Sequence, residues 1–138
     1  MVWNPAQYNL FKEQRSQAFF ELFGLIAIKP IRTIDLGCGS GNLTTKLPGD
    51  EIIAIDSSNE MIQACPKAEK IRFHFGNQEK FDEISGKFDL IFSNAALHWS
   101  KNHSSLIPYL MSRLNSGGQL CFQIPSFVHH ELEAVCQE

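Results

Sequence analysis

The stretch Ile31–Asn42, IRTIDLGCGSGN, constrains this chain more than any other, together with the acid Asp56. A short apolar run ends in an acid and continues into three glycines at alternate positions, Gly37, Gly39 and Gly41. Glycine adopts backbone conformations that other residues avoid, and it has no side chain to hold a ligand away. A strand that breaks into such a loop and then opens a helix can present backbone N–H groups to a ligand. We therefore expect a ligand site directly after the first strand.

A second apolar run, Glu51–Ile55, ends at Asp56. A carboxylate at the carboxyl end of a neighbouring strand can accept hydrogen bonds from both hydroxyls of a ribose. The glycine spacing departs from the dinucleotide fingerprint G-x-G-x-x-G, because the third glycine comes one position early. Asp35, just before the loop, would repel a pyrophosphate but can orient a positively charged amino group. An NAD site is therefore disfavoured, and the remaining alternative is a turn whose glycines only cap and pack.

Composition narrows the class of protein. At 138 residues with 43% hydrophobic residues, the chain is predicted to be one globular domain. The net charge of −3 predicts no broad basic face and no nucleic-acid partner. We expect no membrane span, because the chain has no run of about 18 apolar residues. We also expect no signal peptide, because the first residues do not form a basic segment followed by an apolar one. The cysteines lack C-x-x-C spacing, which predicts reduced thiols, a cytoplasmic location and no metal site: Cys38, Cys65, Cys121 and Cys136.

The order of apolar patterns predicts an α/β fold. The chain reads as an N-terminal helical segment (1–29) followed by a sheet core (30–127), within one domain. Strands are expected at residues 31–36, 51–55, 71–75, 88–92 and 119–124, and helices at 7–28, 43–47, 57–65, 78–84, 103–115 and 128–137. Ser57 and Glu60 have the spacing of a capping box, and Ser104 or Ser105 is the expected cap of the helix that follows the fourth strand. Such alternation favours a mainly parallel, Rossmann-like sheet with helices on both faces.

The N-terminal segment carries three candidate site residues. Trp3 and Tyr8 precede the sheet, so they are either packing anchors or a lid whose aromatic faces favour a sulfonium cation. Arg15 lies seven residues after Tyr8, on nearly the same face of the predicted helix. It can pair with the carboxylate of a methionine moiety or of an anionic substrate, or it is a solvated surface arginine.

Further candidates follow the second, third and fourth strands. Met61 lies one helical turn past Asp56, where its polarisable thioether can cover an adenine ring or simply pack in the core. Asn77 follows the third strand and can donate to and accept from a purine edge, or be a turn residue. After the fourth strand, small residues leave room for a ligand, and His98 and Trp99 can project over a reacting centre or merely pack.

These motifs together resemble a known family. The start Trp3-Asn4-Pro5 with Tyr8, followed in order by DLGCGSGN, IDSSNEMI, FDLIFSNAALHW and LNSGGQLCFQIP, resembles the class I S-adenosylmethionine-dependent methyltransferases. The greatest similarity is to the bacterial trans-aconitate 2-methyltransferase family, over essentially the whole chain. The SNAALHW stretch is also similar to the malonyl-carrier-protein methyltransferases of biotin synthesis.

The resemblance implies S-adenosylmethionine as donor, S-adenosylhomocysteine as product, a seven-stranded sheet and a cytoplasmic monomer. It implies that the methionine end is held by Asp35, Gly37, Cys38, Gly39 and the backbone of Asn94. It places the ribose on Asp56 with Ser57 and Met61 beside it, and the adenine on Asn77 and Gln78. Family members commonly have aspartate where this chain has Asn77, whose amide oxygen can still accept a hydrogen bond from the adenine amino group.

The implied reaction is O-methylation of a small carboxylic acid such as trans-aconitate. Arg15 and His98 are the candidate acceptor contacts, and Trp3, Tyr8 and Trp99 would close the site. No general base is required, because model carboxyl groups have pKa values of about 4 and are ionised at neutral pH. The alternative acceptor is the malonyl thioester of a carrier protein.

The chain is shorter than members of that family. It is expected to lack the final antiparallel hairpin, so that its fifth strand leaves an exposed edge through which it can dimerise. A non-catalytic domain that binds S-adenosylmethionine or dimerises is therefore the alternative to an enzyme.

Overall fold

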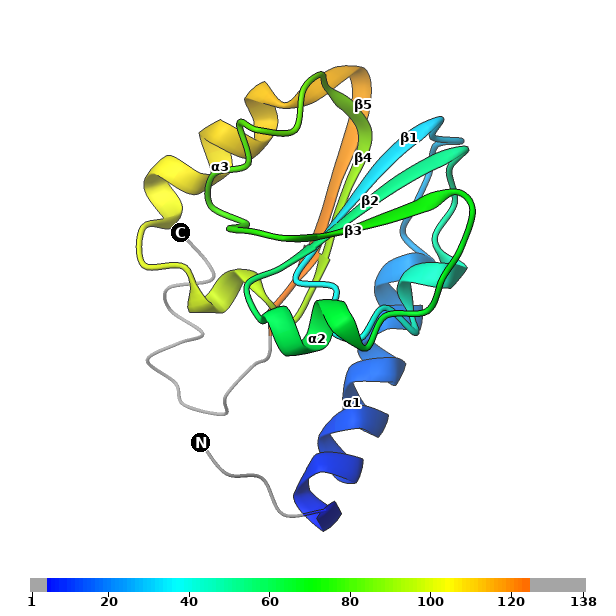
Figure 1. Ribbon diagram of the computed structural model, residues 1–138. Helices are drawn as coiled ribbons and strands as arrows, with labels where there is room; N and C mark the ends of the chain where they lie inside the picture. The colour runs from blue at the N-terminus through cyan, green and yellow to red at the C-terminus, as the bar shows by residue number, and fades with distance from the viewer. Residues whose placement is uncertain (1–4, 125–138) are drawn as a thin grey trace.

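The computed structural model describes residues 5–124, with side chains from residue 12 onward. Trp3 and the helix predicted over 128–137 lie outside the described residues, as does the side chain of Tyr8. Figure 1 shows a twisted sheet between helices, and the elements follow the chain in this order: α1 (Pro5–Phe23), β1 (Arg32–Leu36), η1 (Thr44–Lys46), β2 (Glu51–Asp56), α2 (Asn59–Gln63), β3 (Ile71–Phe75), β4 (Phe88–Asn94), η2 (Leu97–Trp99), α3 (His103–Ser112) and β5 (Leu114–Gln123). The two η elements are single turns of 3₁₀-helix.

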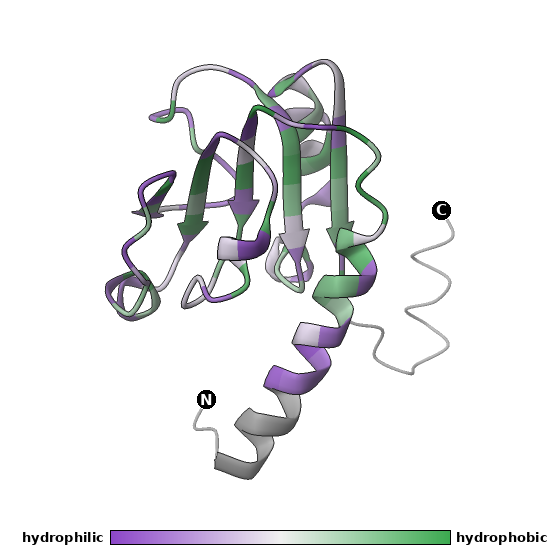
Figure 2. Ribbon diagram, turned by 90° about the vertical axis from the view of Figure 1, so that its right-hand side faces the viewer, coloured by the Kyte–Doolittle hydropathy of each residue, from purple (hydrophilic) through white to green (hydrophobic). Residues whose placement is uncertain are grey.

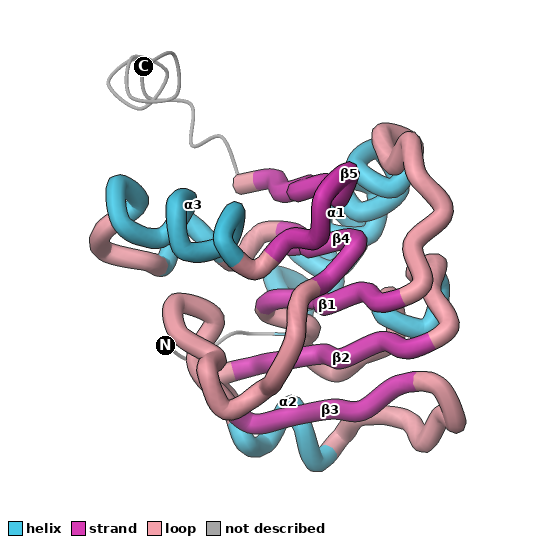
Figure 3. The backbone as a smooth tube through the Cα atoms, turned by 90° about the horizontal axis from the view of Figure 1, so that it is seen from above, coloured by secondary structure: helices cyan, strands magenta, loops and turns pink. Residues whose placement is uncertain are grey.

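The five strands form one sheet in the order β3-β2-β1-β4-β5, and every neighbouring pair is parallel. Figure 3 shows them side by side, with β1 in the middle. Asp35 of β1 lies opposite Ala54 of β2 on one side and Phe92 of β4 on the other. The predicted parallel α/β architecture is confirmed.

Alternation along the central strands builds a core on each face of the sheet. Ile34 and Ile53 face the layer of α3, where Leu106 and Leu110 are buried. The residues that alternate with them along each strand face the other layer, where α1 contributes Phe19. Figure 1 shows α3 on one side of the sheet and α1 with α2 on the other. A strand buried on both faces needs apolar residues at nearly every position, which explains the continuous apolar runs of the sequence.

Helix α1 meets the sheet only through its C-terminal half. Figure 2 shows polar residues in the middle of α1 and apolar ones where it reaches the strands, and Phe19 and Leu22 are the buried residues of that end. The helical spacing of apolar residues runs to residue 28, but α1 ends at Phe23, directly before Gly24. The Gln119 side chain of β5 binds the segment that follows, through hydrogen bonds of 2.9 Å to the Leu25 carbonyl and the Ala27 amide.

Several ends of helices and strands differ from those predicted from the sequence. Strand β4 continues to Asn94, two residues beyond the predicted break, because Ser93 and Asn94 pair with Phe122 and Gln123 of β5. Ser58, and not Ser57, caps α2 by accepting from the Met61 amide. Asn102, and not Ser104 or Ser105, caps α3. At both helix starts, a polar side chain near the predicted cap is the one that accepts a hydrogen bond from an amide of the first turn.

The helix predicted over 78–84 does not form, and a side chain takes its place. This segment consists of turns, whose carbonyl groups have no helical partners. The Arg113 guanidinium donates to the carbonyls of Phe81, Ile84 and Gly86. It also lies 4.7 Å from the centre of the Phe81 ring and donates to the Tyr109 hydroxyl, which itself accepts from the Phe81 amide. One arginine therefore binds three carbonyls of this irregular segment.

We expect Arg113→Met to lower the free energy of unfolding by about 2–4 kcal/mol, because it removes the side-chain donor of the Phe81, Ile84 and Gly86 carbonyls together with the contact on the Phe81 ring. The matched control is Arg72→Met, since the Arg72 side chain is 68% exposed and only pairs with Glu51. That control is expected to cost about 1 kcal/mol or less. Urea denaturation measures both, and equal losses would contradict the role of Arg113.

Candidate cofactor site

The candidate site lies where the order of strands reverses. Strands β1, β2 and β3 progress toward one edge, and β4 then returns to the other side of β1. The loops after β1 and β4 therefore face each other at the carboxyl edge, where open α/β sheets bind ligands. Gly37 has a φ of +77°, and a Cβ on it would lie 2.3 Å from the Cβ of Ala96. Only glycine permits this close approach of the two loops.

The amide groups of the glycine loop are used within the protein. The Gly37 and Cys38 amides donate to the Ile55 carbonyl at 2.7 and 3.0 Å. The Gly39 amide donates to Asp56 Oδ2 at 2.8 Å. The N–H groups of Gly37, Cys38 and Gly39 are therefore already bound to β2 in this structure. The loop is bound to the end of β2, and its lack of side chains is what leaves space beside it.

Asp56 connects this loop to the start of α2. Its Oδ1 accepts from the Ser58 amide at 2.9 Å, while Oδ2 accepts from Gly39. Each carboxylate oxygen can accept two hydrogen bonds, so both oxygens retain a free lone pair. The carboxylate is thus held rigidly with acceptor capacity left for a diol, as the sequence predicts for a ribose site.

Two cavities lie along this edge. The first has a volume of about 250 Å³ and is lined by residues of α1, the glycine loop and β4: Lys12, Arg15, Ser16, Phe19, Asp35, Gly37, Cys38, Gly39, Ser40, Asn42, Leu43, Met61 and Asn94. The second has a volume of about 310 Å³ and is lined mainly by the ends of β2, β3 and β4: Arg15, Gly37, Ile55, Asp56, Ser57, Gly76, Asn77, Gln78, Glu79, Ala95, Ala96 and Trp99. Arg15 and Gly37 line both, so the cavities adjoin at these two residues.

Asp35 is a buried carboxylate in the first cavity. It is 5% exposed and accepts a hydrogen bond of 2.7 Å from the Thr44 hydroxyl. Burial raises the pKa of Asp35 to about 6, against the lowering effects of Thr44 and of the Arg15 charge. Asp56 raises this pKa further through like-charge repulsion. An acid with this environment is poised to receive a cation, which would restore its ionised form.

Arg15 is not a solvated surface residue. Its guanidinium donates to the Gly37 carbonyl at 2.8 Å, and its own carbonyl accepts from Asn94 Nδ2 at 3.0 Å. These two bonds attach α1 to the loops after β1 and β4. Asn94 is 4% exposed, and its Oδ1 has no hydrogen-bond partner among the described residues. A buried acceptor beside a cavity fits a donor group of a ligand.

The second cavity contains the predicted adenine contacts, each of which also has a structural role. Asn77 Oδ1 accepts from the Glu79 amide at 2.8 Å and so forms a turn. Gln78 Nε2 donates to the Ala96 carbonyl at 2.9 Å and fixes the loop after β4. Ser57 is exposed at the rim. Met61 lines the first cavity and not the second.

The aromatic candidates have different positions. Trp99 lines the second cavity yet is 69% exposed, so it stands at the mouth. Its ring centre lies 4.6 Å from that of His98. Burial, with smaller effects of Arg15 and His103, lowers the pKa of His98. A neutral imidazole can bind an acceptor by hydrogen bonding but not as a cation.

Sequence reasoning missed several residues of the first cavity. Lys12, Ser16 and Phe19 of α1 line it together with Arg15. Lys12 lies one helical turn before Arg15, so the spacing alone could have identified it. Thr44 carried no such signal, because its contact with Asp35 depends on the path of the chain after the loop. Among residues 5–124, no cluster of three metal-ligating side chains occurs, and no helix is long and apolar enough to cross a membrane.

Comparison with known proteins agrees with this geometry. Residues 29–138 match the family model of a methyltransferase domain. A trans-aconitate 2-methyltransferase of Deinococcus radiodurans is 38% identical over 137 residues, which cover 94% of this chain and 52% of the relative. One from Escherichia coli is 38% identical over 89% of this chain and 51% of the relative. The chain thus spans about half the length of the curated relatives it matches.

Solved structures share the fold. The ribosomal protein L11 methylase of Lactobacillus delbrueckii is 30% identical, with a TM-score of 0.62 over 79% of this chain and 59% of that one. The N-methyltransferase NodS of Bradyrhizobium japonicum, in complex with S-adenosylhomocysteine, is 21% identical, with a TM-score of 0.68 over 86% of this chain and 66% of that one. The resemblance in the sequence is confirmed: the chain belongs to the methyltransferase domain family, whose cofactor is S-adenosylmethionine.

Proposed function

We propose that this chain binds S-adenosylmethionine across the two cavities and forms the cofactor half of a small-molecule O-methyltransferase. The observation that carries the proposal is the Asp56 carboxylate, which lines the second cavity and is held at the end of β2 by the Gly39 and Ser58 amides. The adenosine occupies the second cavity, with its ribose on Asp56 and its adenine near Asn77 and Gln78. The methionine end occupies the first.

The charges of the first cavity suit an amino acid. Asp35 receives the α-ammonium of the cofactor, and the Oδ1 of Asn94 offers a second acceptor. Arg15 and Lys12 from α1 face the α-carboxylate. Each opposite charge near Asp35 favours its ionised form, so cofactor binding and ionisation of this carboxyl reinforce each other.

The proposed acceptor is a small carboxylic acid such as trans-aconitate. Its support is the name of the curated relatives, which are 38% identical to most of this chain. The chain covers about half of those relatives, so the reaction belongs to the whole protein. A carboxylate oxygen attacks the methyl carbon, the C–S bond breaks as the C–O bond forms, and the sulfonium becomes a thioether.

This transfer needs positioning more than proton chemistry. The nucleophile is already ionised, and opposite charges are neutralised as the methyl group moves. Exclusion of water therefore favours the reaction. Trp99 at the mouth of the second cavity, with Trp3 and Tyr8 at the N-terminus, is the proposed closure. His98 beside Trp99 is a proposed neutral hydrogen-bonding contact for the acceptor.

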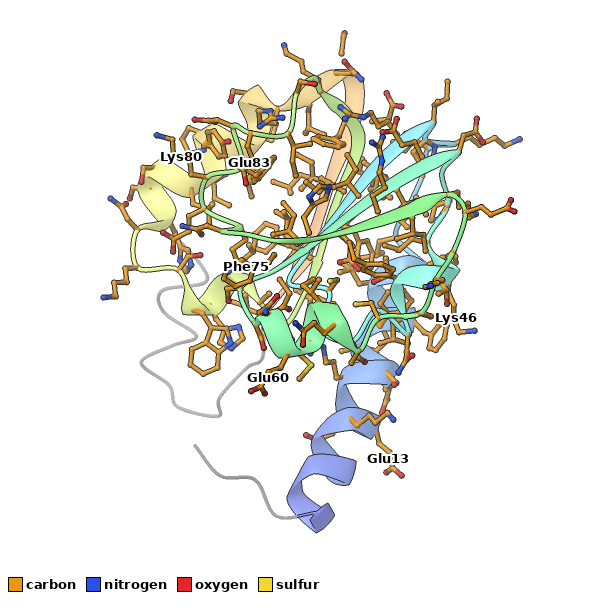
Figure 4. All side chains as sticks on the ribbon, viewed as in Figure 1. Glu13, Lys46, Glu60, Phe75, Lys80 and Glu83 are labelled. Carbon is orange, nitrogen blue, oxygen red and sulfur yellow. The ribbon has the colours of Figure 1, made fainter. Side chains whose placement is uncertain are left out.

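We expect Asp56→Ala to weaken S-adenosylhomocysteine binding by about 100-fold or more, because two charge-assisted hydrogen bonds to the ribose are lost. Calorimetric titration of the whole chain measures the affinity. Glu60→Ala is the matched control, since Glu60 projects from α2 into solvent (Figure 4). Binding that is equally weak in both variants, or unchanged in Asp56→Ala, would contradict the assignment of the ribose.

We expect Asp35→Asn to stabilise the ligand-free chain while weakening cofactor binding about tenfold or more. The pKa of Asp35 is raised to about 6 in the folded state from an ordinary 3.8, so stability falls as pH rises from about 4 to about 6. Above pH 6 the buried charge costs about 2–3 kcal/mol, which the amide avoids. The gain should therefore appear at pH 8 and vanish at pH 4.

Urea denaturation at the two pH values tests this expectation. Asp50→Asn serves as control, because Asp50 is an exposed carboxylate in the turn before β2. A stability difference that is the same at pH 4 and pH 8 would exclude a buried charge as its cause.

A further inference from the structure

Two thiols from separate elements meet under the glycine loop. Cys38 belongs to the loop after β1, and Cys65 follows α2. Both point at one acceptor, because their sulfurs lie 3.5 and 3.6 Å from the Gly39 carbonyl oxygen. The two thiols are also close enough for each to affect the pKa of the other. Neither thiol has a role in the proposed transfer that needs sulfur chemistry.

We propose that Cys38 and Cys65 form a reversible disulfide that weakens cofactor binding. The effect on binding rests on the proposed function, whereas the formation of the bond does not. The pair differs in access, since Cys38 is 8% exposed and Cys65 is half-buried. An oxidant from solvent therefore reaches Cys65 first, and Cys38 completes the bond.

The chemistry balances with a peroxide as oxidant. The Cys65 thiol loses its proton to solvent, and the thiolate attacks one oxygen of hydrogen peroxide. The O–O bond breaks to give a sulfenic acid and hydroxide, which takes up the released proton and becomes water. The Cys38 sulfur then attacks the sulfenic sulfur of Cys65. The S–O bond breaks, and the leaving hydroxide takes the Cys38 thiol proton to form a second water. The two sulfurs together lose two electrons, which reduce the peroxide, and a small thiol or dithiol reverses the reaction.

The surroundings make this pair slow to oxidise and its disulfide hard to reduce. Burial raises the pKa of both thiols, and the charges of Asp35 and Asp56 raise them further. The thiolate is the reactive form, so oxidation should be faster at alkaline pH. Because the reduced state gains nothing from a stabilised thiolate, the equilibrium favours the disulfide more than in a pair with low thiol pKa values.

The bond would move the loop that forms the first cavity. Disulfide-bonded sulfurs lie about 2.05 Å apart, and both thiols are free in this structure, so Cys38 and Cys65 must approach each other to form the bond. The loop cannot yield freely, because a Cβ on Gly41 would already lie 2.5 Å from the Phe73 ring and 3.2 Å from Cys65 sulfur. Displacement of the loop changes the Gly37 and Gly39 walls of the cavity and the bond from Gly39 to Asp56.

The test compares the whole chain, reduced and after treatment with hydrogen peroxide at pH 8. Peptide mapping under non-reducing conditions identifies the bond, and calorimetry measures S-adenosylhomocysteine affinity. We expect a Cys38–Cys65 cross-link, at least tenfold weaker binding, and recovery of both with dithiothreitol. Cys65→Ser should bind normally when reduced and be insensitive to peroxide. Cys121→Ser, a buried thiol of β5, is the matched control and should behave like the wild type.

The outcomes separate the two proposals. Free Cys38 and Cys65 after peroxide, or a cross-link to another cysteine, would overturn the disulfide. A Cys38–Cys65 cross-link with unchanged affinity would overturn its effect on the cofactor. Failure of the reduced wild-type chain to bind S-adenosylhomocysteine would count against the proposed function instead, while the mapped cross-link would still decide whether the bond forms.

Discussion

The hydrogen bonds of the Asp56 carboxylate organise this site. One oxygen accepts from Gly39 and the other from Ser58, so a single side chain joins the loop after β1 to the start of α2. The loop can lie this close because Gly37 has no side chain and meets Ala96 of the facing loop. Three strand ends are thereby brought together at the reversal of the sheet. The same carboxylate that shapes the protein keeps lone pairs for the proposed ribose, so structure and the proposed binding depend on one group.

Charge is distributed to serve a ligand more than to stabilise the fold. Asp35 is buried and its pKa is raised, which means that its ionised form costs stability. Arg15 lowers this pKa, but its guanidinium donates a hydrogen bond to the Gly37 carbonyl and not to Asp35. Asn94 leaves a buried acceptor without a partner in the described part of the chain. Costs of this kind, gathered at one edge of a well-packed sheet, are typical of a functional site.

The two thiols, Cys38 and Cys65, lie in a closely packed part of this site. Cys38 lies between Gly37, where a Cβ would meet Ala96, and Gly39, whose φ of +59° favours glycine, and Cys65 lies against the same loop. A loop whose position is set by contacts on all sides responds to a small covalent change with a change in the shape of the cavity. This is why a bond between two cysteines outside the proposed reaction can alter binding of the cofactor.

The sequence by itself determined the order of the five strands along the chain, the parallel sheet, and the placement of Asp35, the glycine loop and Asp56 at strand ends. These follow from apolar periodicity and from residue types whose chemistry is local, such as glycine at a tight turn. The same reasoning failed over 78–84, where helical spacing competes with the Arg113 side chain that reaches in from the end of α3. It also failed to show that the loop amides are occupied, since their acceptors, Ile55 and Asp56, belong to another strand.

Only the tertiary structure decided which distant residues meet. It placed Lys12 and Arg15 of α1 over the first cavity, Thr44 on Asp35, and Cys65 beside Cys38. The physical reason is that periodicity reports which face of an element is buried but not which partner covers it. Partners are chosen by the packing of whole elements against one another, and that packing depends on every face at once.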